Sequence, residues 1–383
     1  MLTLCCFINE TTYTNKKENK EKPFYSVKQV FQDHWFDYKR AHNPRKVEIE
    51  EVEKMLSCKQ RCFVCYCKKC NNYEFVLLGC NSRICSCCGK RYTDQWADRL
   101  SRKVIKGIYH RHFTFSLPIE LRGVIKQNRY LQKVISDSAF KTIKRLFSKM
   151  KKKHLMPGVI SVVHPFGKDL KFNPHVHCIV TEGGFDKSGK FVQLGRYIPY
   201  DLLHKEWQYV VLNELKKYLD KGFIDFLFRK YPNGFAPNVN PLRISGKELA
   251  KYIGRYVRHP AIANSRIIAY NKEAVKFYYR DHQEQIHYKI MLSGDFISAI
   301  IQHIPDKNFR LVRYYGSYSR RKTKVIKQSI IRQKILIDFD NKKEICCSKC
   351  GERMEIVLFC DKPPPKDMSK IGNWIELHSG AVR

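Results

Sequence analysis

The stretch that decides the fold of this chain reads Asn173-Pro174-His175-Val176-His177-Cys178-Ile179-Val180-Thr181-Glu182-Gly183-Gly184. Successive side chains of an extended strand point to opposite faces, so His175 and His177 share one face while Val176 and Cys178 share the other. This geometry offers two imidazoles to one metal ion. Two histidines that only hydrogen-bond their neighbours on a half-buried strand would explain this stretch equally well.

A second strand is predicted just before this one, over residues 158–164, where the sequence Gly-Val-Ile-Ser-Val-Val-His is rich in β-branched residues. A short polar connection, residues 165–171, joins the two strands and predicts an antiparallel pair. His164 would then lie within the pairing, where it is a candidate third imidazole. A lone histidine is more often a core or surface residue, so both interpretations stay open.

Further strands and helices are expected around this pair. Residues 110–117 predict a strand with Phe113 and Phe115 on one face. Residues 128–154 have apolar residues at helical spacing and predict an amphipathic helix that ends in a basic run, which either contacts DNA or forms a solvated face. Helices are also expected over residues 201–221, 223–230 and 296–304, a loop over 232–241, and a hairpin from residues 274–279 and 285–292.

A helix with two tyrosines is predicted after residue 244. Ser245 followed three residues later by Glu248 is a capping box, so the helix should begin there. Tyr252 and Tyr256 are four residues apart and share one face of that helix. Two amphipathic rings at the edge of an ordinary helix would give the same pattern, so the pair is informative only together with the histidine strand and the charge of the chain.

The composition indicates a nucleic-acid partner. The 72 Lys and Arg exceed the 36 Asp and Glu and leave a net charge of +36. Neutralising phosphates releases condensed counterions, which favours nucleic acid over a membrane surface as the partner. A length of 383 residues suits two or three domains. No apolar run approaches the roughly 20 residues that cross a bilayer, and residues 1–22 do not resemble a signal peptide, so the chain is expected inside a cell.

Nine of the sixteen cysteines lie within residues 58–88, which in a reducing compartment indicates metal binding rather than disulfides. The pairs Cys67-x-x-Cys70 and Cys85-x-x-Cys88 are separated by fourteen residues and predict one structural zinc site with four thiolates. A cluster of merely buried thiols is the alternative. A second ion, or Cys80 in place of one of the four, stays open because five cysteines are surplus. These are Cys58, Cys62, Cys65, Cys80 and Cys87.

The carboxy-terminal part holds the most basic segment. Residues 310–334 contain nine Lys or Arg, no acidic residue and the tyrosines Tyr314, Tyr315 and Tyr318. This composition predicts a surface for a DNA strand, with charges along phosphates and rings stacked on bases, or an exposed basic tail. Farther on, only Cys347-x-x-Cys350 among the last four cysteines has knuckle spacing. The candidate DNA-contacting residues of the whole chain are Lys151, Lys152, Lys153, Arg255, Arg258, Arg313, Arg320 and Arg321.

These signals divide the chain into four expected regions. Residues 1–45 form a polar amino-terminal arm with a short amphipathic helix over 27–38. Residues 46–105 form a zinc-binding and DNA-binding module, and residues 106–292 form the catalytic domain. Residues 293–383 form a basic DNA-binding region with the candidate second metal knuckle.

Three of these motifs, in order along the chain, resemble those of the HUH endonucleases, named for histidine, hydrophobic, histidine. The closer resemblance is to the two-tyrosine bacterial transposases of the insertion sequence 91 type, which have an amino-terminal cysteine-rich zinc domain. The resemblance covers roughly residues 55–320. This sequence differs from the family pattern in the extra cysteines of residues 58–88 and at His259, where a basic residue is more usual. The three motifs are Phe113-Thr114-Phe115-Ser116, Pro174-His175-Val176-His177 and Tyr252-x-x-x-Tyr256, and the match continues through Phe166-Gly167, Gly183-Gly184 and residues 256–260, 303–310 and 313–316.

The resemblance implies an α+β fold, an HUH-endonuclease-like antiparallel sheet flanked by helices and preceded by a small cysteine-rich zinc module. It implies a divalent cation at His175 and His177, with His164 as third ligand, since the eleven-residue spacing is similar to that of the related relaxases. The family implies magnesium or manganese at this site and structural zinc in the module. Imidazole ligands by themselves favour zinc, manganese or another transition ion over magnesium.

The implied reaction is rolling-circle transposition of an insertion sequence. Tyr252 or Tyr256 attacks a phosphodiester of single-stranded DNA, which leaves a 5′-phosphotyrosine on the enzyme and a free 3′-hydroxyl. The other tyrosine acts on the second strand or resolves the intermediate. The implied partners are single-stranded transposon ends and target DNA, in the bacterial cytoplasm and associated with the nucleoid.

Three other functions are compatible with the same residues. A replication initiator or relaxase would use the same chemistry, but the chain has no Gly-x-x-x-x-Gly-Lys-Ser/Thr loop, which argues against a fused relaxase-helicase. A non-enzymatic zinc-dependent DNA-binding protein would need the tyrosines and histidines only for its structure. A metal-dependent hydrolase would activate water in place of a tyrosine.

Overall fold

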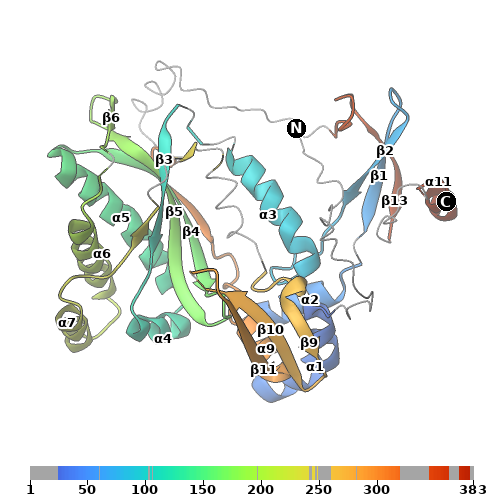
Figure 1. Cartoon of the computed structure of the whole chain (residues 1–383), viewed down its shortest axis with the longest axis horizontal. Coiled ribbons are helices and arrows are strands. Elements are labelled where there is room, and N and C mark those ends of the chain that lie inside the picture. Colours follow the sequence, from blue (N-terminus) through green and yellow to red (C-terminus); the bar gives the residue numbers. More distant parts are fainter. Residues whose placement is uncertain are drawn as a thin grey trace.

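The computed structural model describes residues 25–59, 61–101, 104–105, 107–195, 197–240, 244–245, 248, 260–281, 283–319, 345–361 and 371–379. Within these residues the strands form three sheets, and every strand pair is antiparallel. Helices flank the sheets, so the predicted α+β class is confirmed. Figure 1 shows the largest sheet in one half of the molecule and the β1–β2–β13 sheet at the opposite end.

The largest sheet has the strand order β12-β4-β5-β3-β7, with β6 paired to β5 and β8 paired to β3. The predicted pairing of the two central strands is confirmed, and His164 lies directly opposite His175. The bounds of these strands are β3 Tyr109–Phe115, β4 Met156–Phe166, β5 Phe172–Phe185, β6 Phe191–Gln193, β7 Asn238–Val239, β8 Ile244–Ser245 and β12 Val312–Gly316.

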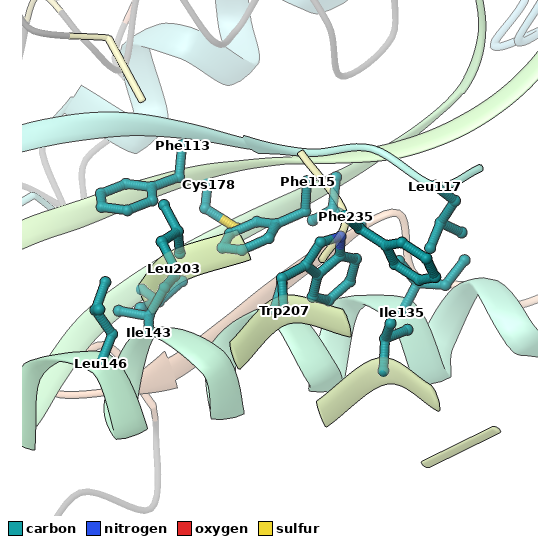
Figure 2. Packing of buried hydrophobic residues seen from close by; sticks show 14 of the residues in the cluster. Phe113, Phe115, Leu117, Ile135, Ile143, Leu146, Cys178, Leu203, Trp207 and Phe235 are labelled. Carbon is teal, nitrogen blue, oxygen red and sulfur yellow. The ribbon is translucent and has the colours of Figure 1, made fainter. Parts of the chain in front are cut away.

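Helices cover one face of this sheet and form the main hydrophobic core with it. Figure 2 shows Phe113, Phe115 and Cys178 of the strands facing Trp207 and Ile143 of the helices. Each of these side chains is at most 1% exposed, and burial of such a side chain stabilises the fold by about 1.5–3 kcal/mol. The helices are α4 Ile119–Gln127, α5 Leu131–Lys151, α6 Tyr200–Leu215 and α7 Lys221–Lys230.

The opposite face of the sheet is covered in part by α3 (Ser86–Ser101), which follows the cysteine-rich segment. Leu100 and Val104 pack against Ile160, Val162 and Ile179 of β4 and β5. These strand residues alternate with the core-facing ones, so they share their face with the histidines. The cysteine-rich module is thereby attached to the histidine face of the sheet.

A second sheet, in the order β11-β10-β9, packs with three helices. The predicted hairpin is confirmed as β10 and β11. The helix predicted in the amino-terminal arm is α1, which is capped by Ser26 and contacts α9, with Val30 and Phe31 fully buried. The elements are α1 Val27–His42, α2 Lys46–Leu56, η1 Asn264–Arg266, β9 Ile267–Tyr270, β10 Ala274–Arg280, β11 Ile286–Leu292 and α9 Ser293–Ile301.

The third sheet joins distant parts of the sequence. Its order is β13-β1-β2, so β13 near the carboxy terminus pairs with β1 of the cysteine-rich segment. The packing therefore divides the chain differently from the expected regions: β12 belongs to the central sheet, whereas β13 belongs to the cysteine-rich module. The elements are β1 Cys62–Cys67, β2 Asn72–Leu77, β13 Glu355–Cys360 and the nearby α11 Ile371–Ser379.

None of the helices in the described part of the chain is both long and apolar enough to cross a bilayer.

Candidate active site and metal centres

The three predicted histidine ligands meet on one face of the central sheet. Nδ1 of His164 lies 3.2 Å from Nε2 of His175, which lies 3.1 Å from Nε2 of His177. The strand pairing places His164 and His175 opposite each other, and the two-residue period adds His177 to the same face. Three ring nitrogens that approach one another this closely suit a shared metal ion better than three separate hydrogen-bonded side chains.

One ring of the cluster is oriented by the backbone. Nδ1 of His175 lies 2.7 Å from the carbonyl oxygen of Asn173 and donates its proton to it. This bond fixes the tautomer of the neutral ring, so Nε2 keeps its lone pair and faces the other two histidines. A metal-ligating histidine characteristically donates its second ring N–H in this way.

A fourth histidine, which the sequence analysis did not select, supports the cluster from the neighbouring strand. Nε2 of His112 lies 2.9 Å from Nδ1 of His177, and the hydroxyl of Thr114 lies 3.3 Å from both nitrogens. If Nδ1 of His177 donates to His112, then Nε2 of His177 keeps its lone pair and can supply it to an ion. The alternation of His110, His112 and Thr114 along a predicted strand was the signal that could have revealed this contact.

The histidines at the centre of the cluster are held neutral. Burial, and to a lesser extent the charge of His175, lowers the pKa of His112 to about 4. Burial also lowers the pKa of His177 well below its ordinary value, with further contributions from His175, His164 and His112. Both rings are therefore unprotonated at neutral pH and can supply lone pairs. A set of neutral imidazoles fits a transition ion such as manganese or zinc more closely than magnesium.

The two candidate nucleophiles, Tyr252 and Tyr256, lie outside the described residues, as do Arg255 and Arg258. The chain on either side of them is described. Ser245 is extended in β8, and the helix predicted to begin there lies, except for Glu248, outside the described residues.

The cysteines form two clusters instead of the single site expected. The prediction that Cys67, Cys70, Cys85 and Cys88 share one ion is wrong, because the two pairs lie in different structural units. The first pair ends β1 and packs beside β13, whereas the second pair stands at the start of α3 in the core formed with α1 and α2. One cluster is Cys58, Cys80, Cys85 and Cys88, and the other is Cys67, Cys70, Cys347 and Cys350.

In the first cluster the Sγ atom of Cys88 lies 3.6 Å from that of Cys58 and 3.9 Å from that of Cys80. Both open alternatives therefore bear on this arrangement: Cys80 joins Cys85 and Cys88, and the two clusters could hold two ions. Four sulfurs at such distances suit tetrahedral zinc.

The basic candidates are dispersed. Lys151, Lys152 and Lys153 are exposed at the end of α5, on the face of the sheet opposite the histidines, and Lys153 forms an ion pair with Asp186 at 2.7 Å. The guanidinium of Arg313 in β12 lies 5.5 Å from the ring centre of Phe309. Arg320 and Arg321 lie outside the described residues.

Two of the three tyrosines expected to stack on bases have structural roles instead. The hydroxyl of Tyr315 donates to Asp137 at 2.7 Å, and its ring stacks on Phe140. The hydroxyl of Tyr318 lies 2.6 Å from Nε2 of His110. Both rings are fixed by β12 and residues 317–319, which pack onto the central sheet.

Two family models match the chain. The one described as "Transposase zinc-binding domain" matches residues 30–117, and the one described as "Putative transposase" matches residues 158–325. The first match contains all of the cluster of Cys58, Cys80, Cys85 and Cys88. The second contains the three histidines and both tyrosines of the Tyr-x-x-x-Tyr motif.

The chain is also similar to two named bacterial proteins. It is 28% identical over 300 residues to the transposase for insertion sequence element IS801 of Pseudomonas savastanoi pv. phaseolicola, which covers 72% of each chain. It is 26% identical over 277 residues to the putative transposase y4qJ of Sinorhizobium fredii, which covers 67% of this chain and 69% of that protein. No solved structure matches the chain.

Proposed function

We propose that this chain, which belongs to the family of insertion sequence 91 type transposases, cuts single-stranded DNA with a tyrosine and transfers the cut strand. The observation that carries the proposal is the convergence of His164, His175 and His177 on one face of the sheet. The matched transposase region also contains Tyr252 and Tyr256. An ion site and a phenol nucleophile are the two parts that this chemistry requires.

The reaction exchanges one phosphate ester for another. The phenol oxygen of Tyr252 or Tyr256 forms a bond to phosphorus, and the bond from phosphorus to the 3′ oxygen breaks. The phenol loses its proton and the departing 3′ oxygen gains one, so a 5′-phosphotyrosine and a free 3′-hydroxyl result. The second tyrosine then repeats the step on another strand, as rolling-circle transposition requires.

A phenol with a pKa near 10 is a poor nucleophile at neutral pH. A divalent cation, when bound, neutralises the non-bridging phosphate oxygens and orients the phosphate for in-line attack. The chain's own contribution is to lower the pKa of His177 by burial and to hold the imidazoles in place. His175 is held by the carbonyl of Asn173, and His177 is held by His112.

The described ends of the tyrosine segment support its assignment to this site. Before it, Ser245 pairs with Tyr109 of β3, the strand that also contains His112. After it, Ala261 and Ile262 are buried in the core against which Phe166 packs, two residues beyond His164. The segment is thus attached at both ends to elements that adjoin the histidine cluster.

The test is the formation of a covalent adduct. Purified protein is incubated with end-labelled single-stranded oligonucleotides that carry the ends of the insertion sequence, with Mn²⁺ or Mg²⁺, and analysed on a denaturing gel. We expect an adduct with the parent chain and none with the variant Tyr252→Phe/Tyr256→Phe. Tyr288→Phe is the matched control, because Tyr288 is 64% exposed on β11 and lies outside the site.

The outcomes separate the competing functions. An adduct in the double variant would contradict the tyrosine assignment. Cleavage without an adduct would indicate a hydrolase that uses water. If both the parent chain and Tyr288→Phe bind the oligonucleotide without cleaving it, the protein is a non-enzymatic DNA-binding protein.

A further inference from the structure

We propose that Cys67, Cys70, Cys347 and Cys350 form a second structural zinc site, which joins the amino-terminal cysteine-rich hairpin to a knuckle near the carboxy terminus. The zinc-binding family match ends at residue 117 and therefore includes only half of these ligands. The site makes the cysteine-rich module discontinuous in sequence, with the whole catalytic region inserted between its two halves.

The positions of the sulfurs carry the proposal. Sγ of Cys70 lies 3.3 Å from that of Cys347 and 3.7 Å from that of Cys350, and Sγ of Cys67 lies 3.5 Å from that of Cys350. With Zn–S bonds of about 2.3 Å, the edges of a tetrahedron of sulfurs are about 3.8 Å long. A disulfide would require a separation of about 2.05 Å. The four sulfurs therefore have the spacing of a shared ion.

The two turns have the same local shape. Asn71, which follows Cys70, has a φ of 52°, and Gly351, which follows Cys350, has a φ of 74°. Both turns therefore place the residue after the second cysteine in the left-handed region, which Gly and Asn adopt most readily. The chain reverses there, so that both sulfurs of each pair point into the same space.

Backbone hydrogen bonds fix the second knuckle. The N–H of Gly351 donates to the carbonyl of Cys347 at 2.9 Å, and the N–H of Cys347 donates to the carbonyl of Glu352 at 2.8 Å. These two bonds close the turn that contains both carboxy-terminal ligands.

The two knuckles are held against each other by a buried carboxylate. Glu74 of β2 is 3% exposed, and its Oε1 accepts from both the backbone N–H and the hydroxyl of Ser348, at 2.7 Å each. The side-chain amide of Asn72 donates to the same oxygen at 3.3 Å. These hydrogen bonds fix Ser348, which lies between Cys347 and Cys350 in sequence. They leave the sulfurs of both cysteines available to bind an ion.

The apolar core around this site is small. Its buried members are Cys65, Cys67, Cys347 and Met354, so hydrophobic burial alone contributes little to holding the two segments together. Ion pairs across the seam, such as Lys68 with Glu355, are exposed and contribute little to stability. The pairing of β1 with β13 brings the two segments together, and a bound ion would hold the four thiols at these short distances.

The first test counts metal ions in the full-length chain. The measurements use a His175→Ala/His177→Ala background, so that the histidine cluster contributes no ion, and zinc is measured by plasma mass spectrometry. We expect two zinc ions per chain, and one in the variant Cys347→Ser/Cys350→Ser. The variant Cys67→Ser/Cys70→Ser should also retain one ion, and so should the combination of all four substitutions, because they empty the same site.

Cys346→Ser is the matched control, since this thiol is adjacent to the knuckle but is not in the cluster, and it should retain two ions. An unchanged zinc content in Cys347→Ser/Cys350→Ser would overturn the proposal, as would loss of both ions in the fourfold variant while Cys346→Ser retains two.

A second measurement needs no cysteine variant and stays decisive if those variants fold poorly. The zinc-free background chain is titrated with Co²⁺, and the thiolate-to-cobalt charge-transfer absorption should rise until two equivalents are bound. Saturation at one equivalent, or a disulfide between the two knuckles in protein purified under reducing conditions, would contradict a second four-thiolate site.

Discussion

The histidine cluster and the cluster of Cys67, Cys70, Cys347 and Cys350 are held by scaffolds of different kinds. The histidines project from paired strands whose other face belongs to a core of large, fully buried side chains such as Phe115 and Trp207. The four cysteines lie in two short turns, around which Met354 is the one buried apolar residue other than cysteine within the described part of the chain.

This difference determines what each metal is needed for. A sheet with a large core on one face forms whether or not an ion sits on the other face, so the histidine site is arranged before metal arrives. The cysteine turns are joined by the short pairing of β1 with β13 and by small apolar clusters, so an ion bound there would contribute to folding itself. Loss of metal should therefore leave the central sheet folded and unfold the cysteine turns.

Zinc removal should give the largest effect. Structural zinc contributes about 10–16 kcal/mol of binding free energy in zinc-finger peptides. We expect a zinc chelator to remove hydrogen-exchange protection from residues 62–77 and 345–361, measured by mass spectrometry, while β4 and β5 stay protected. Loss of protection throughout the chain would mean that the two scaffolds are not independent.

Disruption of a buried ion pair should give the next largest effect, and it should act on the central sheet alone. Arg111 and Glu182 pair with side chains 6% and 2% exposed. Arg111→Met leaves the carboxylate buried without its partner, which typically costs about 3–5 kcal/mol. Urea unfolding should show this loss, and zinc content should stay unchanged.

The matched control for this change is Lys39→Ala, which removes an exposed ion pair to Glu53. It should change stability by less than about 1 kcal/mol. If Arg111→Met and Lys39→Ala lowered the free energy of unfolding equally, the buried ion pair would not be a main stabilising interaction of the central sheet.

The smallest effect is expected at His112, which touches a ligand without being one. His112→Ala should weaken Mn²⁺ binding about 10–100-fold, the usual loss when the hydrogen-bond partner of a ligating histidine is removed. Calorimetric titration of Mn²⁺ measures it, and His112→Asn, which restores an acceptor, should recover part of the affinity. The exposed His154→Ala is the control. Unchanged Mn²⁺ affinity in His112→Ala would show that His112 serves only the packing.

Local patterns predicted the two central strands of the largest sheet well. The strand with His175 and His177, the preceding strand with His164 and their antiparallel pairing all follow from side-chain alternation and a short connection, and the structure has each of them. The helix over α5 and the hairpin of β10 and β11 were predicted from periodicity in the same way.

Two features could not be predicted from the sequence, because they depend on which strands become neighbours. His112 contacts His177 only because β3 pairs with β5 in one particular register. Tyr315 and Tyr318, which suit a DNA surface by composition, are packed because β12 joins the edge of the central sheet. Burial of this kind is not visible in a basic, aromatic-rich sequence.

The sequence by itself determined the kinds of site that this protein can hold: three Cys-x-x-Cys pairs near the amino terminus, one near the carboxy terminus, three histidines suited to an ion and two tyrosines four residues apart. Ligand type and local spacing depend only on a few adjacent residues. Tertiary structure alone decided which pairs share an ion, because Cys67 and Cys70 meet Cys347 and Cys350 through the pairing of β1 with β13. Spacing within a segment constrains a turn, whereas contact between segments more than 270 residues apart is set by the packing of the chain between them.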